Sequence, residues 1–182
     1  MVLSLGPRMK THQTALVILP PEALCGPIQE LRRAHDRHYP RWMPHITLLY
    51  PFWPQERFVE ARRRIAAVCN DYGPFVLKLA ELRSFLHGRA GSTAWLAPEP
   101  AEPVKELQHR LQEVFPECDD TANFDSGYTP HLSVGQAREN LDAVMAQMRS
   151  VLRPIEFEVQ GVALIARKGD EPFHVVELVR FP

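Results

Sequence analysis

The chain has 182 residues, of which 45% are hydrophobic and 24% are charged, and its formal net charge at pH 7 is −1. This length predicts one folded domain or two small intertwined lobes, and the composition excludes a predominantly disordered chain. The near-neutral charge excludes a broad basic surface for non-specific nucleic-acid binding, so any anionic ligand has to be held by local contacts.

The first part of the chain alternates between the hydrophobic periods of a strand and of a helix. The apolar run TALVIL predicts a buried strand, and a helix follows it, although Gly26-Pro27 is expected to weaken the first turn. The expected order is strand, helix, strand, helix and strand, over Thr14–Leu19, Leu24–His35, His45–Tyr50, Gln55–Asn70 and Phe75–Phe85.

The second part of the chain repeats this order and then adds strands. The pattern predicts a strand, an amphipathic helix, a strand and a second helix, over Thr93–Ala97, Val104–Val114, His131–Gly135 and Leu141–Leu152. Two closing strands, Ile155–Arg167 and Phe173–Phe181, are expected around a turn at 168–170.

The two series indicate a weak structural duplication with half-repeats at about 14–85 and 92–181. Each half has too few helices per strand for a doubly wound parallel sheet. We therefore expect a single domain over 1–182 with an α+β fold. Its two lobes would have mainly antiparallel sheets flanked by helices, related by a pseudo-twofold axis around a central cleft.

One short pattern occurs in both halves: proline, histidine, apolar residue, hydroxyl residue, apolar residue. It reads Pro-His45-Ile-Thr47-Leu in the first half and Pro-His131-Leu-Ser133-Val in the second. Because side chains alternate along a strand, each histidine shares a face with its hydroxyl residue while the apolar residues point into the core. If the lobes face each other, two imidazoles and two hydroxyls line one cleft.

This set of groups suits a phosphodiester. The hydroxyls of Thr47 and Ser133 can donate hydrogen bonds to phosphate oxygens, and His45 and His131 can act as a general acid and a general base near neutral pH. We expect His131 to be the base that activates water and His45 to be the acid, with the roles exchanged in the reverse reaction. No metal and no cofactor are needed for this scheme.

The segments PHITLL and PHLSVG, 86 residues apart, resemble the paired motifs of the 2H phosphoesterase superfamily, which includes 2′-5′ RNA ligase and RNA 2′,3′-cyclic phosphodiesterase proteins. The resemblance runs over about 14–181 and implies a bilobal fold with a central cleft. It also implies metal-independent chemistry on RNA ends or nucleotides, with His45 and Thr47 in the first motif and His131 and Ser133 in the second. A non-catalytic nucleotide-binding module with the same cleft is the alternative.

Further residues near the motifs are candidates for contacts with a base or a phosphate, namely Tyr128, Arg41 and Phe52, since an aromatic ring beside a cleft can stack on a base. Trp53 next to Phe52 could equally be core. The remaining candidates for phosphate contacts are Arg83, Arg89, Arg167 and Lys168. A metal site built on His35 and His38, which have an aspartate between them, is a further alternative, although no second carboxylate and no cysteine cluster support it.

The sequence carries few signs of other partners. Its longest apolar runs, Ala15–Leu19 and Val162–Ala166, are much shorter than the roughly 18 residues of a membrane span, and residues 1–13 lack the apolar segment of a signal peptide. Three cysteines without C-x-x-C spacing favour a reducing, cytoplasmic location. RNA ends or nucleotides are the expected partners, with no membrane and no obligate protein partner.

Overall fold

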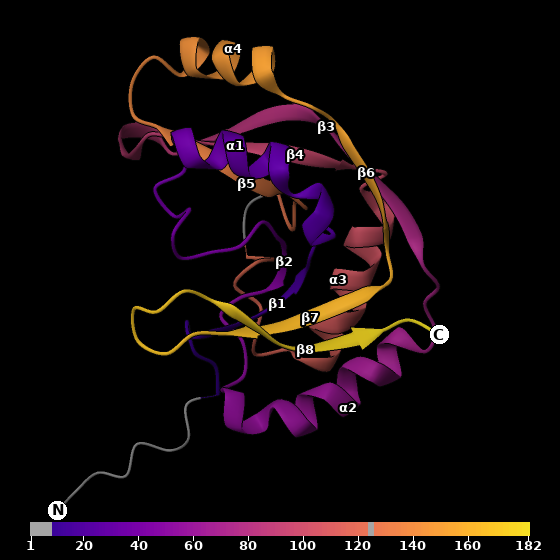
Figure 1. The fold of residues 1–182 in the computed structure, drawn as a ribbon. Coiled ribbons are helices and arrows are strands. Elements are labelled where there is room, and N and C mark those ends of the chain that lie inside the picture. The colour runs from indigo at the N-terminus through magenta and orange to yellow at the C-terminus, as the bar shows by residue number, and fades with distance from the viewer. Residues whose placement is uncertain (1–8, 124–125) are drawn as a thin grey trace, which may run out of the picture.

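A computed structural model of the chain describes residues 9–123 and 126–182, which form two four-stranded antiparallel sheets and four α-helices (Figure 1). The expected α+β fold with two antiparallel sheets is confirmed. In chain order the strands are β1 (Thr14–Ile18), β2 (Ile46–Leu49), β3 (Phe75–Leu86), β4 (Ser92–Glu99), β5 (Leu132–Ala137), β6 (Ile155–Val159), β7 (Gly161–Ala166) and β8 (His174–Arg180). The helices are α1 (Gly26–His35), α2 (Phe58–Cys69), α3 (Glu102–Val114) and α4 (Leu141–Val151).

The two sheets have matching layouts. The first sheet has the strand order β2-β1-β7-β8 and the second has the order β5-β4-β3-β6. The two strands that carry the histidine motifs, β2 and β5, therefore occupy corresponding edges. Each of them pairs with the strand that begins its half of the chain, β1 or β4.

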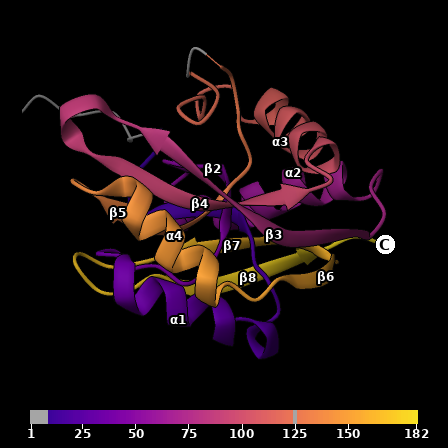
Figure 2. The same cartoon turned by 90° about the horizontal axis from the view of Figure 1, so that it is seen from above.

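The helices that connect these strands cross to the opposite sheet. Helix α1, which follows β1, packs against β5, and α3, which follows β4, packs against β2. Figure 2 shows α1 and α4 on one side of the molecule and α2 and α3 on the other. This exchange of helices connects the two lobes, because each sheet is covered in part by a helix from the other half of the chain.

Close packing of α1 and α4 on β5 depends on Gly135. A Cβ atom at this position would lie 2.6 Å from Met148 of α4 and 2.7 Å from the Cβ of His35 of α1. Such distances are well inside van der Waals contact, so a larger residue would push the helices away from the strand that carries the second motif.

Two elements differ in detail from the sequence-based expectations. The helix expected over 24–35 begins at Gly26 as α1 and has a proline in its first turn, where the missing N–H has no intrahelical partner to lose. The single strand expected over Ile155–Arg167 is two strands in different sheets: β6 pairs with β3, whereas β7 pairs with β1 and β8. The sequence changes there from the alternation IEFEV to the continuous apolar run VALIA, which suits a central strand buried on both faces.

The core has two parts. The large part fills the space between the sheets and their helices, and it contains the inward-facing residues of both motif strands. The small part lies on the other face of the first sheet, where Ala15, Val17, Ala163, Ile165 and Phe173 pack with the half-buried Leu19, Trp42, Met43 and Tyr50.

Candidate active site

The first motif lies at the start of edge strand β2. Ile46 and Leu48 are fully buried, whereas His45 and Thr47 are only half-buried. The alternation expected from the sequence is therefore present, and it places the imidazole and the hydroxyl on the face that looks away from the large core.

The second motif has the same arrangement at the start of β5. Leu132 and Val134 are fully buried, whereas His131 and Ser133 are half-buried. In both motifs the residue before the histidine is a proline, which has no N–H to leave unpaired at the start of an edge strand.

Both imidazoles are held by the same hydrogen bond. His45 Nδ1 lies 2.7 Å from the carbonyl oxygen of Met43, and His131 Nδ1 lies 2.8 Å from that of Thr129, two residues upstream in each case. A carbonyl oxygen can only accept a hydrogen bond, so Nδ1 carries the proton in each neutral ring. The lone pair is then on Nε2, which is the atom available for proton transfer to or from a ligand.

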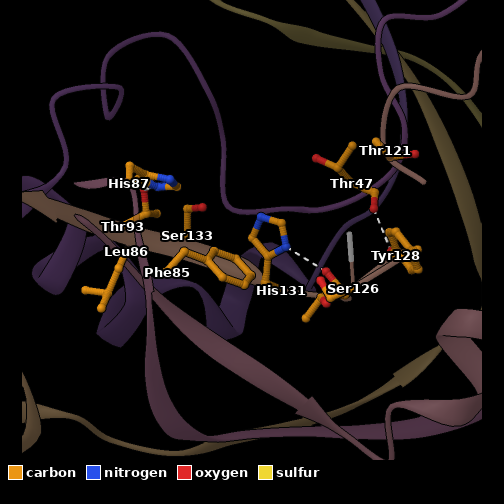
Figure 3. Close-up of a pocket in the computed structure, with 12 residues that line it drawn as sticks. Thr47, Phe85, Leu86, His87, Thr93, Thr121, Ser126, Tyr128, His131 and Ser133 are labelled. Atoms are coloured by element: carbon orange, nitrogen blue, oxygen red, sulfur yellow. Dashed lines mark hydrogen bonds between the residues drawn. The ribbon is translucent and has the colours of Figure 1, made fainter. Parts of the chain in front are cut away.

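The motifs line two adjoining cavities. The larger, of about 400 Å³, is called the His131 cavity, and it includes Thr47 from the first motif as well as His131 and Ser133 from the second (Figure 3). The smaller, of about 210 Å³, is called the His45 cavity, and it includes Ser133. Thr93 and Ser133 line both cavities. Each cavity therefore combines residues from both motifs, as expected if the two edge strands face one cleft.

The surroundings of both rings favour their neutral forms. Burial lowers the pKa of His45 to about 4, and the Arg32 guanidinium and the charge of His131 act in the same direction. The hydrogen bond that His45 donates to the Met43 carbonyl and the Asp36 carboxylate act in the opposite direction. Burial likewise lowers the pKa of His131, against its bond to Thr129. A charged His131 disfavours a charged His45, so the two rings lie within electrostatic range of each other.

A buried ion pair supports the His45 side of the site. Arg32 Nε donates to Asp36 Oδ2 at 2.8 Å, and both side chains are only 2% exposed. Arg32 Nη2 also donates to the carbonyl oxygen of Trp42 at 2.8 Å, and Asp36 Oδ1 accepts a hydrogen bond from Gln136 of β5. This network fixes the segment before the first motif to the strand that carries the second.

Aromatic rings contact each histidine. The Trp42 ring is stacked on His45 with centroids 4.7 Å apart, and a second aromatic neighbour of Trp42, Phe173, is stacked 3.8 Å away. Phe85 and Trp95 approach His131 edge to face, at 5.1 and 5.9 Å. The sequence analysis did not select Trp42, Phe85 or Trp95 as residues of the site. The position of Trp42, an aromatic residue three residues before His45, is the one sequence feature that could have identified one of them as a candidate.

Tyr128 joins the two motifs. Its hydroxyl donates to the backbone carbonyl of Thr47 at 2.7 Å, and the residue lines the His131 cavity. Burial raises the pKa of Tyr128, so the phenol stays protonated as a donor at neutral pH. The sequence-based candidate is thus beside the motifs, although its hydroxyl is engaged by the protein.

The other candidates lie elsewhere. Phe52 and Trp53 are buried, and each packs on Phe115 with centroids 5.0 Å apart, which assigns them to the core instead of to a ligand contact. Arg41 is exposed and is not among the described residues that line the two cavities. Arg83, which pairs with Glu81, and Arg89 are likewise exposed and outside the two cavities. The half-buried Arg167 and the exposed Lys168 line a different cavity.

Histidines outside the motifs also have defined places. His87, near the tip of the β3–β4 hairpin, lines the His131 cavity with its Nε2 3.0 Å from the Thr93 hydroxyl, and His38 lines the His45 cavity. His35 packs toward β5. Within 9–123 and 126–182, no group of three or more histidine, cysteine, aspartate or glutamate side chains is arranged to hold a metal ion. None of the helices in these ranges is long and apolar enough to cross a membrane.

Comparison with known proteins gives consistent results. The family model described as the 2′-5′ RNA ligase superfamily matches residues 20–171. A protein of Geobacillus kaustophilus, named "Putative phosphoesterase", is 26% identical over 148 residues, covering 79% of this chain and 80% of its own. A Bacillus mycoides protein with the same type of name is 27% identical over 143 residues, with 78% of each chain covered.

Solved structures share the fold at lower identity. A Thermus thermophilus protein superposes with a TM-score of 0.65 at 17% identity, covering 92% of this chain and 97% of its own. E. coli LigT complexed with 3′-AMP superposes with a TM-score of 0.62 at 13% identity, covering 93% of this chain and 98% of its own.

Proposed function

The chain belongs to the 2′-5′ RNA ligase superfamily, and from that premise we propose that it is a metal-independent phosphodiesterase acting on 2′,3′-cyclic phosphates or 2′-5′ linkages of RNA ends or small nucleotides. One observation supports the proposal most strongly. Both imidazoles are bound through Nδ1 to a backbone carbonyl, and they line adjoining cavities that have Ser133 in common. The 3′-AMP held by LigT, whose fold this chain shares, supports a nucleotide as ligand.

The proposed reaction divides the work among four side chains. Thr47 and Ser133 donate hydrogen bonds to the non-bridging oxygens of the phosphate and so hold it between the two histidines. For a cyclic phosphate, one Nε2 takes a proton from water while the oxygen of that water bonds to phosphorus. The other imidazolium gives its proton to the ribose oxygen whose bond to phosphorus breaks, which leaves a phosphomonoester.

The pKa values of His45 and His131 bear on which of the two rings is the general base. A general base has to be neutral, and the pKa of about 4 makes His45 neutral over the whole physiological range. Burial lowers the pKa of His131 as well, so the two shifts do not rank the rings, and the proposal keeps the sequence-based roles of His131 as the base and His45 as the acid in hydrolysis of a cyclic phosphate. In the opposite direction of the reaction the roles exchange.

Turnover of a substrate panel tests the function. The panel contains 2′,3′-cyclic mononucleotides, 2′-5′ dinucleotides and RNA ends, with wild type, His45→Ala and His131→Ala. We expect turnover by wild type that EDTA does not change, and a loss of roughly 10²- to 10⁴-fold in each variant. His109→Ala is the matched control, because this histidine is exposed on α3.

Two outcomes would reject the proposal. One is full activity of either histidine variant on the substrate that wild type cleaves. The other is activity that requires an added divalent metal. Tight nucleotide binding without turnover of any member of the panel would favour the alternative of a non-catalytic binding module.

A further inference from the structure

A third cavity lies away from the two histidine motifs. It has a volume of about 750 Å³ and is found where β1 begins and β7 ends, beside the segment that leads into α2. It shares no lining residue with the His131 cavity or the His45 cavity. It is called the Arg167 cavity, and its charged and amide lining residues are Gln13, Gln55, Glu56, Arg57, Arg167 and Lys168.

Hydrogen bonds hold the backbone around the Arg167 cavity in place. The N–H of Arg167 donates to the carbonyl oxygen of Gln13 at 2.8 Å, which extends the pairing of β1 with β7 by one residue. The buried Thr14 hydroxyl donates to the carbonyl oxygen of Trp53 at 2.9 Å and so connects β1 to the segment before α2. Because these walls are already positioned, a ligand that binds there adds little ordering cost.

Two side chains of this cavity have buried polar atoms without a hydrogen-bond partner. Within 9–123 and 126–182, five buried side-chain atoms lack a partner, and three of them are Gln13 Oε1, Arg167 Nε and Arg167 Nη1. An arginine side chain stays charged at any physiological pH, and buried donors of a charged group are normally satisfied by a protein group, a water or an ion. The concentration of unpaired atoms at one cavity therefore points to a ligand.

Both side chains can present donors to such a ligand. Arg167 is half-buried and lines the cavity, so rotation of its terminal torsions brings its N–H groups to a ligand there. The amide of Gln13 can turn by 180°, which replaces its unpaired oxygen with an NH₂ group.

The charges around the cavity favour an anion. Arg57, Arg167 and Lys168 line it, against the single carboxylate of Glu56. The described residues provide Arg57 with Glu60 as a partner at 3.1 Å, but they pair neither Arg167 nor Lys168 with a carboxylate. Since the whole chain has a net charge of −1, this excess of positive charge is a local feature.

A phosphate group fits these donors better than a carboxylate does. A phosphate monoester has up to about two negative charges and three acceptor oxygens, whereas a carboxylate has one charge and two oxygens. A guanidinium matches phosphate geometry with parallel N–H donors, and an ammonium adds a compact charge. The volume of about 750 Å³ is within the range of small-molecule pockets, so the group that carries the phosphate has room as well.

We propose that the Arg167 cavity is a second phosphate-binding site, separate from the histidine motifs, which takes a phosphate group carried by a nucleotide or by an RNA strand. Arg167 supplies the buried donors, the Gln13 amide supplies a neutral one, and Lys168 adds charge at the rim. No bond is made or broken at this site, so it does not depend on the proposed function.

Packed rings connect this site to the first motif. The guanidinium carbon of Arg167 lies 5.3 Å from the Phe173 ring, Phe173 is stacked on Trp42 at 3.8 Å, and Trp42 is stacked on His45 at 4.7 Å. The Arg167 guanidinium is therefore no farther from the His45 imidazole than these three distances placed end to end. That span is covered by a few nucleotides at about 3.4 Å each, so one strand can reach both sites.

Titration with inorganic phosphate, followed by NMR, tests the site. The signals observed are the side-chain Nε–H of Arg167 and the imidazoles of His45 and His131. We expect the Arg167 signal to shift saturably in wild type and also in the double variant His45→Ala/His131→Ala, because the Arg167 cavity includes neither histidine. Sodium chloride at matched ionic strength is the control and should give no saturable shift. An Arg167 signal that does not respond, or that responds equally to chloride, would overturn the site.

Substitution of the cations gives a second measurement. In the double histidine variant, phosphate should raise the unfolding temperature through the Arg167 cavity alone, and the increase reports the dissociation constant. Arg167→Gln should raise this constant about tenfold or more, since charged hydrogen bonds are lost, and Arg167→Lys and Lys168→Gln should raise it less. Arg63→Gln is the matched control, because Arg63 is exposed on α2 and outside the cavity, and it should change the constant by less than about twofold. Equal constants for Arg167→Gln and Arg63→Gln would contradict the proposal.

Stability without phosphate separates binding from a structural role of Arg167. The charge removed in Arg167→Gln has no partner among the described residues, so its unfolding temperature in phosphate-free buffer should be no lower than that of the parent protein. A marked decrease, together with unchanged phosphate affinity in Arg167→Lys and Lys168→Gln, would mean that Arg167 supports the fold and binds no ligand.

Two further ligands distinguish the sources of the phosphate. If the source is a nucleotide, 3′-AMP should shift the Arg167 signal at lower concentration than inorganic phosphate, with a dissociation constant separate from that of the histidines. If the source is a strand, an RNA hexanucleotide with a 3′-phosphate should shift the signals of Arg167, His45 and His131 with one dissociation constant. A failure of both ligands to bind more tightly than inorganic phosphate would overturn the assignment. A silent Arg167 signal beside responding histidine signals would overturn this site alone and leave the proposed function intact.

Discussion

The two histidine motifs have the same backbone arrangement and different surroundings. In each, a proline precedes the histidine at the start of an edge strand, and Nδ1 is bound to a carbonyl two residues upstream. Around His45, however, lie a buried ion pair and a stacked tryptophan, whereas His131 is approached by Phe85, Trp95 and the cavity that Tyr128 lines. The duplicated strand motif thus provides two histidines with the same backbone geometry, and the residues around each histidine give the two rings different chemical environments.

The largest expected effect concerns the ion pair, which only the His45 side has. Asp36→Asn removes the charge opposite a guanidinium that is almost fully buried, so we expect a loss of about 3–5 kcal/mol in the free energy of unfolding, measured by urea denaturation. Glu60→Gln breaks exposed pairs with Arg57 and Arg64 and should cost no more than about 1 kcal/mol. Equal losses in the two variants would show that the buried pair does not support this side of the site.

The lowered pKa values of the two rings predict an acidic pH optimum. Hydrolysis of a cyclic phosphate needs one neutral and one protonated ring, so kcat/KM should be bell-shaped, with one limit near the pKa of about 4 of His45 and the other at the pKa of His131, which burial lowers from its usual value of about 6.5. Beyond each limit the rate should change about tenfold per pH unit. A kcat/KM that is still increasing above pH 7 would contradict the lowered pKa values.

Removing one aromatic neighbour from each histidine sharpens the comparison. Trp42→Leu removes the ring stacked on His45, and Phe85→Leu removes one that approaches His131 edge to face. Aromatic contacts of this kind are worth about 0.5–1.5 kcal/mol, so kcat/KM should fall up to about tenfold in each variant. Titration of the rings by NMR should show the larger pKa change at His45 for the first variant and at His131 for the second. A change at the distant ring alone would be inconsistent with direct contact.

The smallest expected effect belongs to the link between the motifs. Tyr128→Phe deletes one hydrogen bond to the Thr47 carbonyl, worth about 0.5–1.5 kcal/mol, so we expect a loss of a few-fold in kcat/KM with little change in fold. Tyr39→Phe, at an exposed hydroxyl bound only by Arg33 at 3.5 Å among the described residues, serves as the control. Indistinguishable kinetics for the two variants would mean that the link does not position Thr47.

Much of this arrangement follows from local patterns in the sequence. The alternation around His45 and His131 decides which side chains face away from the core, and the proline before each histidine marks the start of its strand. The split of 155–167 into β6 and β7 was missed because both segments favour extended backbone and follow each other directly, so the change from the alternating IEFEV to the continuous VALIA was not taken as a change of sheet. The sequence also did not decide whether Phe52 contacts a ligand or packs in the core, since an aromatic residue after a motif strand can face either the cleft or the core.

The surroundings of the histidines could not be predicted from the sequence, because they depend on the exchange of helices between the sheets. Asp36, at the end of α1 and paired with Arg32, accepts a hydrogen bond from Gln136 of β5, 100 residues later in the chain. No periodicity reports such a contact. The difference between the surroundings of His45 and those of His131 therefore appears only when the fold is known.

The claim that two rings act on one phosphate can be tested directly by NMR titration of both imidazoles with 3′-AMP. The account predicts that the signals of His45 and His131 shift together with one dissociation constant, and that the pKa values of both rings rise when the phosphate is bound. Shifts confined to one ring, or two rings that respond with different dissociation constants, would contradict a shared phosphate site.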